Sequence, residues 1–146
     1  MDSSSETMVE ELTADECWAL LSRAELGHLA VAVAGAIDIF PINFIAADGM
    51  LLFRTAPGSK LLELSINPQV AFEVDEYDDR SAASVVVKGV AERVEVQSEI
   101  DAADALPLRP WIPTLKYRWV RIVPAEVTGR RFPRSAEPDR YAVLDE

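Results

Sequence analysis

The sequence is poor in the residues that build disulfides and zinc sites. Cys17 is the only cysteine and His28 the only histidine in 146 residues. A single cysteine excludes an intramolecular disulfide, and these two residues are too few for a zinc site of cysteine and histidine ligands. A chain of this length is most simply one domain, and it buries roughly 70% of its unfolded surface without such staples.

Long apolar runs and the start of a signal peptide are also missing. Residues Met1–Glu11 are acidic and polar, without the cationic and apolar parts of a signal peptide. The charge-free run Leu29–Ile37 is much shorter than the roughly 20 residues that cross a bilayer. We therefore expect a cytoplasmic protein in which residues 1–12 are a flexible leader and residues 13–146 form a single domain.

Basic residues are scarce, with 14 Lys and Arg against 25 Asp and Glu and a net charge of −11. Nucleic acids and anionic membranes are held mainly by Lys and Arg, so neither is expected as a partner. The charge is uneven, because residues 1–108 carry 20 acids and 6 bases whereas residues 109–146 carry 5 acids and 8 bases. The basic tail could cover an anionic ligand or pair with the chain's own carboxylates.

The pattern of apolar residues predicts a mainly β domain with few helices. A capping-box pattern, Thr13 with Glu16 three positions later, predicts a helix up to about Glu25, and Cys17 lies in its apolar stripe. Six strands are predicted at residues 28–34, 37–46, 50–55, 69–75, 83–96 and 117–127, and short helices at 59–66 and 98–105. We expect the first three strands to form an antiparallel meander, and all six to form a small antiparallel barrel.

Two glycines mark places where the predicted strands turn or bend. Asp48-Gly49 suits a tight hairpin between the second and third strands. Gly89 interrupts the long apolar fifth strand, where a glycine often marks a bulge or a barrel corner. The bend at Gly89 favours a barrel over a flat sheet.

The second and third predicted strands are apolar on both faces. In the second strand Ile39, Pro41 and Ile45 alternate with Phe40, Ile42 and Phe44. A sheet covered on one side only would carry polar residues at every second position. The second face must therefore be covered by the chain's own helices or by a second copy, and we favour a homodimer.

The stretch Leu51–Ile66, LLFRTAPGSKLLELSI, predicts a strand, a glycine-containing turn and the start of a helix. Unpaired backbone N–H groups and peptide dipoles at a helix N-terminus favour a bound phosphate. Arg54 and Lys60 add positive charge, and the hydroxyls of Thr55 and Ser59 can donate to the same oxygens. An equally open alternative is that Ser59 is an N-cap, Lys60 is solvated and Arg54 pairs with a carboxylate.

A second candidate stretch lies one predicted hairpin away from Arg54. Its residues are Pro41, Ile42, Asn43 and Phe44. Proline cannot donate to a sheet ladder, so backbone groups near Pro41 would be free to meet a ligand. Asn43 adds a side-chain amide to an apolar strand, but a kink in which Asn43 bonds to a loop is equally open.

Four segments together carry a family resemblance. The order and spacing of FPINF, LLFRTAPGSKL, VAFEVDEYD and SVVVKGVAERV resemble the flavin-binding split barrels similar to pyridoxamine 5'-phosphate oxidase, above all their short flavin-nucleotide-binding members. The resemblance spans roughly residues 16–132. It implies a mainly β fold, a six-stranded antiparallel split β-barrel, that forms a homodimer with FMN at the subunit interface.

The resemblance also implies roles for individual residues. The FMN phosphate would be held by Arg54, Thr55, Ser59 and Lys60, and the isoalloxazine ring would be lined by Pro41, Ile42, Asn43 and Phe44. Ser84 would make a polar contact to the flavin, and Trp111, Arg130 and Arg131 match regions that can cover it from the partner subunit. From the residues alone, Trp111 could equally plug the core and the two arginines could pair with surface acids.

The chain departs from the family pattern in two places. Many relatives carry an aromatic residue just before the long strand, where this chain has Ser81, Ala82 and Ala83. Their C-terminal arginine motif for a substrate phosphate is missing as well, so vitamin B6 oxidation is not expected.

We therefore expect a flavin-dependent oxidoreductase acting on a small molecule, with no catalytic acid or base that the sequence identifies. The alternatives are a deazaflavin-dependent reductase of the same fold and a non-enzymatic flavin-binding reservoir or sensor. His28, alone at the start of an apolar strand, is expected to be structural. The acidic run that begins at Asp75 lacks the spacing and glycine of an EF-hand, so no metal site is expected.

Overall fold

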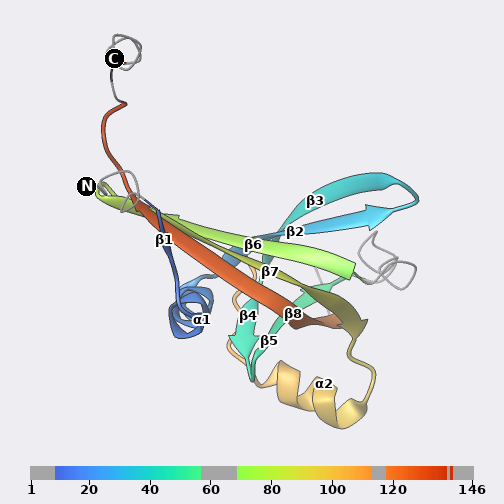
Figure 1. Ribbon diagram of the computed structural model, residues 1–146. Coiled ribbons are helices and arrows are strands. Elements are labelled where there is room, and N and C mark those ends of the chain that lie inside the picture. Colours follow the sequence, from blue (N-terminus) through green and yellow to red (C-terminus); the bar gives the residue numbers. More distant parts are fainter. Residues whose placement is uncertain (1–8, 57–68, 113–117, 138, 140–146) are drawn as a thin grey trace.

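The computed structural model describes residues 9–56, 69–112, 118–137 and 139. Within them, one curled antiparallel sheet is accompanied by two helices (Figure 1). The strands are β1 (Glu10–Glu11), β2 (Leu26–Val33), β3 (Ala36–Asn43), β4 (Ile45–Ala47), β5 (Met50–Thr55), β6 (Gln69–Tyr77), β7 (Ser81–Arg93) and β8 (Arg118–Pro133). The helices are α1 (Ala14–Arg23) and α2 (Gln97–Asp104).

The predicted mainly β fold with short helices is confirmed, and each of the six predicted strands is present. The described residues form eight strands because the predicted second strand is divided into β3 and β4 at Phe44, and because β1 adds a two-residue strand. Phe44 leaves the ladder because its ring turns into the core, where its centroid lies 4.8 Å from that of Phe72. Its N–H donates to the carbonyl oxygen of Glu25 at 3.2 Å.

The predicted antiparallel pairings of the first three strands are present, but they do not form one continuous meander. The strands follow the order β3-β2-β6-β7-β8-β5-β4, so β3 and β4 lie at opposite ends of the sheet although only Phe44 separates them in sequence. β3 pairs with β2, whereas β4 pairs with β5 and β5 with β8. The chain therefore crosses at Phe44 from one end of the curled sheet to the other.

Helix α1 covers the inner face of the sheet. The predicted capping box is confirmed: Thr13 N–H donates to Glu16 Oε1 at 2.8 Å, and Glu16 N–H donates to Thr13 Oγ1 at 3.2 Å. The helix ends at Arg23, two residues before the predicted end. Cys17 is buried in the main core, as predicted for a small hydrophobe.

Helix α2, predicted at 98–105, covers the opposite face of the sheet near β5 and β8. Ala103 of α2 packs there against Leu52 and Trp119, with Val94 beside them. We call the face that turns away from α1 the outer face. On β7 it carries Ser84, Val86, Lys88 and Val90, which alternate with buried residues.

The predicted turning points are also confirmed. Asp48 and Gly49 both have positive φ angles, 52° and 72°, as a tight hairpin requires. The β7–β8 register shifts between Lys88 and Gly89, which makes the predicted bulge. A Cβ added to Gly89 would lie 2.2 Å from the carbonyl oxygen of Val123, so this close approach requires glycine.

Two sequence predictions at the edges of the described residues have different outcomes. Glu10 and Glu11 pair with Arg131 and Arg130 of β8, so the end of the stretch expected as a leader belongs to the sheet. The predicted helix at 59–66 lies outside the described residues. In the described part of the chain, no helix has the length and apolarity needed to cross a membrane.

Candidate functional site

Arg54 of β5 lies on the outer face, above an aromatic ring. It pairs with Trp119 of β8, and its guanidinium carbon lies 5.4 Å from the centre of the Trp119 ring. Trp119 is buried, and its Nε1–H donates to Asp104 Oδ1 of α2 at 2.7 Å. The hydrogen bond to Asp104 thus fixes the indole, and a cation–π contact holds the Arg54 guanidinium against its ring.

The sequence left open whether Arg54 pairs with a carboxylate. Other arginines of the chain do so: Arg23 pairs with Glu76 at 2.5 Å, and Arg121 pairs with Glu99 at 2.6 Å. Within the described residues, no carboxylate lies within ion-pair distance of Arg54. Its N–H donors therefore remain available to an anion that the described chain does not supply.

The other predicted phosphate ligands are placed differently. Thr55 follows Arg54 on β5 and points to the opposite face, where it is only 2% exposed. Ser59 and Lys60 lie outside the described residues. Of the predicted phosphate ligands that the structure describes, only Arg54 presents its side chain on the outer face.

The side chains of the stretch predicted to line the flavin ring, residues 41–44, point alternately away from the core and into it. Ile42 and Phe44 are buried in the core, so only their backbone groups could meet a ligand. Pro41 is exposed on the outer face opposite His28. Asn43 is half-buried at the end of β3.

The side-chain amide of Asn43 is bonded within the chain. Its Oδ1 accepts the backbone N–H of Trp111 at 2.8 Å, and its Nδ2 donates to the carbonyl oxygen of Glu25 at 3.2 Å. This is the loop-bonded arrangement that the sequence left open. Trp111 itself is 59% exposed, so it does not plug the core.

The backbone positions of Arg54 and Asn43 are linked by a short path through β4 and β5. Asn43 is two residues from Ile45, which pairs with Leu52, and Leu52 is two residues before Arg54. At about 3.3 Å per residue and about 4.8 Å between strands, this path is at most about 20 Å long. The crossing at Phe44 thus brings the two predicted stretches together, although no sheet ladder joins β3 to β5.

Ser84 lies far from Arg54 in the same chain. Ser84 pairs with Arg130 of β8, whereas Arg54 pairs with Trp119 of the same strand. The stretch of β8 between those partners is about 30 Å long or more at about 3.3 Å per residue. Arg54 and Ser84 therefore belong to well-separated parts of β5 and β7 within one chain.

The two arginines of the predicted basic tail lie in different surroundings. Arg130 and Ser84 line a groove of about 550 Å³ between β1 and the outer face of β7 and β8. Arg131 lines a separate hollow of about 330 Å³ with Glu76 and Asp78. There the hydrogen bonds from Arg23 hold the pKa of Glu76 below its usual value, and Arg131 adds a smaller effect.

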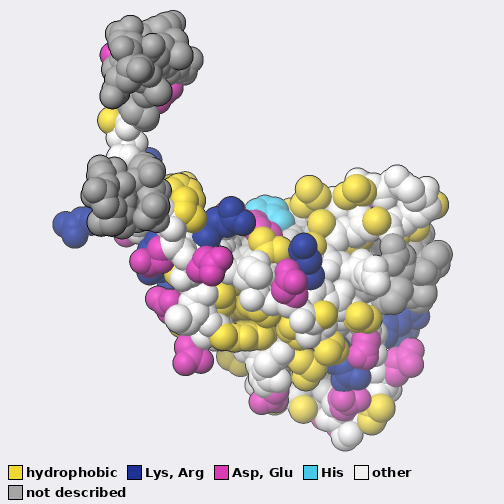
Figure 2. Space-filling view, viewed as in Figure 1, with side chains coloured by type: hydrophobic (Ala, Val, Ile, Leu, Met, Phe, Trp, Pro, Cys, Tyr) yellow, Lys and Arg dark blue, Asp and Glu magenta, His cyan; other side chains and the backbone are white. Residues whose placement is uncertain are grey.

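The outer face of β2 and β3 is apolar, and no described element of the chain covers it. Ile37 and Ile39 of β3 are 75% and 66% exposed, and Figure 2 shows hydrophobic side chains at the surface over the β2–β3 hairpin. Alanines from β2 and β6 and Val90 of β7 line an adjoining hollow of about 420 Å³. Helices α1 and α2 pack elsewhere on the sheet, so neither covers this surface.

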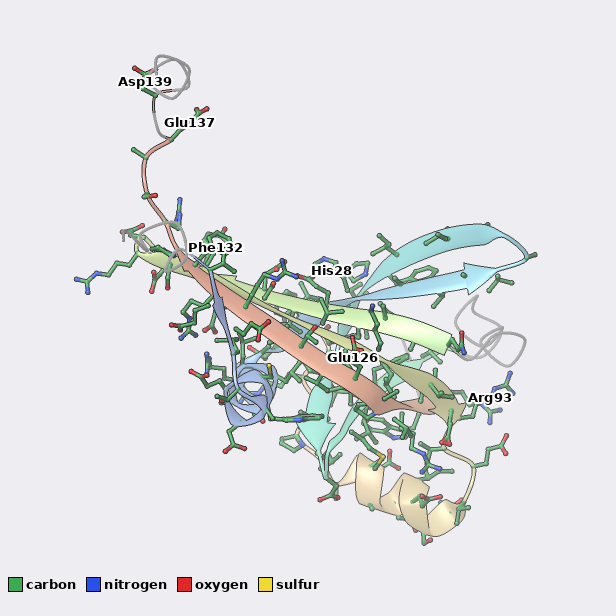
Figure 3. The ribbon with its side chains drawn as sticks, viewed as in Figure 1. His28, Arg93, Glu126, Phe132, Glu137 and Asp139 are labelled. Atoms are coloured by element: carbon green, nitrogen blue, oxygen red, sulfur yellow. The ribbon has the colours of Figure 1, made fainter. Side chains whose placement is uncertain are left out.

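A small polar group interrupts this apolar face. His28 Nδ1 lies 3.5 Å from Glu73 Oε1, between β2 and β6 (Figure 3). Burial, a hydrogen bond with Asp75 and the charge of Asp75 raise the pKa of Glu73 to about 7. No three His, Cys, Asp or Glu side chains in the described ranges converge as a metal site would require.

Trp119 and Asp104 belong to this site but were missed in the sequence. No role was predicted for Trp119 because its contact with Arg54 depends on the pairing of β5 with β8, strands more than sixty residues apart. Asp104 reaches the same indole from α2. No local pattern in the sequence signals such a pairing.

Comparison with known proteins places the chain in a family. The family model described as pyridoxamine 5'-phosphate oxidase matches residues 13–131. The uncharacterized Mycobacterium tuberculosis protein Rv0080 is 32% identical over 130 residues, which cover 84% of this chain and 85% of that protein.

Solved structures of similar proteins support the same family assignment. A Corynebacterium glutamicum protein named for pyridoxamine 5'-phosphate oxidase is 46% identical, with a TM-score of 0.83 and coverage of 94% of this chain and 99% of that one. The FAD binding protein from Mycobacterium smegmatis is 40% identical, with a TM-score of 0.76 and coverage of 85% and 98%. These likenesses confirm the predicted split-barrel fold. The chain belongs to the pyridoxamine 5'-phosphate oxidase family.

Proposed function

We propose that this protein binds a flavin nucleotide, FMN, between two copies of the chain and uses it in oxidoreductase chemistry on a small molecule. The observation that carries the proposal is Arg54. It is a cation without a carboxylate partner among the described residues, and it is fixed over Trp119. In a chain with a net charge of −11, a guanidinium without a carboxylate partner is well suited to a phosphate.

The separation between Arg54 and Ser84 supports a shared site. Because about 30 Å or more of β8 lies between their partners, this separation favours a site in which Ser84 comes from the second copy. A two-fold dimer uses the same surface on both chains. The uncovered apolar surface around Ile37 and Ile39 supplies such a surface.

The relatives favour a flavin and leave its size open. The Mycobacterium smegmatis relative is named for binding FAD. FMN and FAD share the isoalloxazine ring, the ribityl chain and the first phosphate, so Arg54 would serve either molecule. When bound, the flavin supplies the electron-transfer chemistry, and the chain binds and orients it.

The test is a titration of the purified protein with FMN, FAD and a deazaflavin, with the molecular mass followed by light scattering. Tight FMN binding by a dimer is expected. Arg54→Met should weaken FMN binding by about ten- to a hundredfold, because a charged hydrogen bond contributes about 1.5 to 3 kcal/mol. Arg80→Met, an exposed arginine in the β6–β7 turn, is the matched control.

Each other result changes the proposal. Unchanged FMN affinity in Arg54→Met would refute the phosphate site, and a monomer that binds FMN would refute the shared site. Binding of the deazaflavin alone would make the protein a deazaflavin-dependent reductase. If NADH and NADPH fail to reduce the bound flavin, a flavin reservoir or sensor becomes the better assignment.

A further inference from the structure

The amide of Asn43 joins three parts of the chain. Asn43 ends β3, its Nδ2 donates to the carbonyl of Glu25 just before β2, and its Oδ1 accepts the N–H of Trp111. The neighbouring N–H of Phe44 donates to the same carbonyl of Glu25. The start of β2, the crossing between β3 and β4 and the segment after α2 therefore meet at one side chain.

The segment after α2 runs from the surroundings of Arg54 to Asn43. Leu106 and Leu108 pack against the cluster of Leu52 and Trp119, next to the Arg54 guanidinium. Beyond Leu108 the chain continues to Trp111, whose backbone is held by Asn43 while its ring is largely exposed. This segment thus spans the gap between the two candidate stretches of the site.

Few hydrogen bonds from the described residues hold the end of that segment. Hydrogen bonds tie Leu106 to Ala103 and Leu108 to Leu106 within the segment itself. Among the described residues, the bond from Trp111 to Asn43 is the only hydrogen bond made by residues 109–112. Among the described residues, the backbone of Trp111, which carries the ring, is therefore held by one side-chain amide.

We propose that Asn43 is a positioning residue, which fixes the segment Leu106–Ile112 so that the exposed ring of Trp111 forms an aromatic wall of the cofactor site. This inference rests on the proposed flavin binding and changes the part that Asn43 plays in it. Both ends of its amide are already bonded, so Asn43 acts on the flavin through Trp111. An aromatic ring offers a flat face for stacking against a flavin ring.

Two substitutions at position 43 separate its two bonds. Asn43→Ala removes both the bond to Trp111 and the bond to Glu25. Asn43→Asp keeps an oxygen that accepts the Trp111 N–H but loses the donor to Glu25. Trp111→Phe keeps the backbone N–H, and so the bond to Asn43, but removes the indole.

The first measurement uses the flavin-free protein, so it does not depend on the proposed function. Hydrogen exchange at the Trp111 amide should be about tenfold faster in Asn43→Ala than in the parent, because the amide loses its only acceptor. In Asn43→Asp it should stay near the parent rate. If parent and Asn43→Ala exchange equally fast, the inference is overturned.

The second measurement uses the flavin complex. An indole stacked on a flavin quenches its emission, so bound flavin should be dim in the parent and brighter in Trp111→Phe. Asn43→Ala should brighten the flavin as Trp111→Phe does and weaken binding about tenfold. The double variant should be no brighter than Trp111→Phe, and Asn43→Asp should resemble the parent.

A purely structural role for Asn43 predicts a different outcome. Asn43→Ala would then lower thermal stability and flavin affinity but leave the emission of bound flavin as in the parent, and this would overturn the inference. If the parent binds no flavin, the proposed function fails and the inference fails with it. The exchange rate at Trp111 would still show whether Asn43 holds the segment.

Discussion

Glu73 makes the stability of the fold depend on pH. It lies on the outer face of β6 beside Asp75, where it pairs with His28 of β2, and Lys88 of β7 lies on the same face. Its pKa is raised from 4.5 to about 7, first by burial and then by Asp75. A carboxyl with a raised folded-state pKa binds its proton more tightly when folded, so the free energy of unfolding should fall as pH rises from about 4.5 to about 7.

The size of the effect follows from that interval. If the whole pKa shift counted, ionised Glu73 would lower the free energy of unfolding by about 3 kcal/mol. The side chain of Glu73 is 32% exposed, so water screens part of this cost and we expect about 1 to 2 kcal/mol. Glu73→Gln keeps the shape of the protonated carboxyl, and should raise the free energy of unfolding by that amount at pH 8.

The assay is urea unfolding of the flavin-free protein at pH 5 and pH 8, at one protein concentration. At pH 5 the parent already keeps Glu73 protonated in the folded state. Glu73→Gln should therefore raise the free energy of unfolding by less than half as much at pH 5 as at pH 8. Glu95→Gln makes the same charge change at an exposed position between β7 and α2. Equal gains at both pH values, or an equal gain in Glu95→Gln, would refute the reasoning.

Three substitutions test the fold at particular contacts. Gly89→Ala places a Cβ against the Val123 carbonyl and should cost about 3 kcal/mol in urea unfolding; a loss below 0.5 kcal/mol would contradict the close approach. Thr13→Ala removes the capping box and should cost about 1 kcal/mol in the same assay, and a neutral effect would count against the cap. Phe44→Ala empties the site against Phe72 and should lower stability by about 3 to 5 kcal/mol, measured by thermal unfolding; unchanged melting would show that Phe44 is not buried.

Local features of the fold could be predicted because their causes are local. The capping box at Thr13 needs only two side chains one helical turn apart, and the hairpin at Gly49 needs only residues that accept positive φ. The bulge at Gly89 was predicted from one glycine in an apolar run, because few other causes place a glycine there. The strands likewise follow from short β-rich runs.

The arrangement of the strands could not be predicted in the same way. A sequence pattern indicates a strand but does not name its neighbour, so β3 and β5 were placed side by side when the structure separates them. The same limit applies to the site. Arg54 was predicted as a phosphate ligand, but its contact with Trp119 depends on the pairing of β5 with the distant β8. The inward side chain of Thr55 follows from strand alternation once the face of Arg54 is known.

The crossing at Phe44 also constrains how the chain can fold during synthesis. β5 has only the three-residue β4 as a partner until Arg118–Ile122 of β8 are made, because β8 supplies its other neighbour. The second end of the sheet therefore depends on contacts between residues far apart in sequence, which generally form slowly. Until the ribosome has released β8, the edge of β5 stays open to other nascent chains, so aggregation should compete with folding most strongly for ribosome-bound chains from which β8 has not yet emerged.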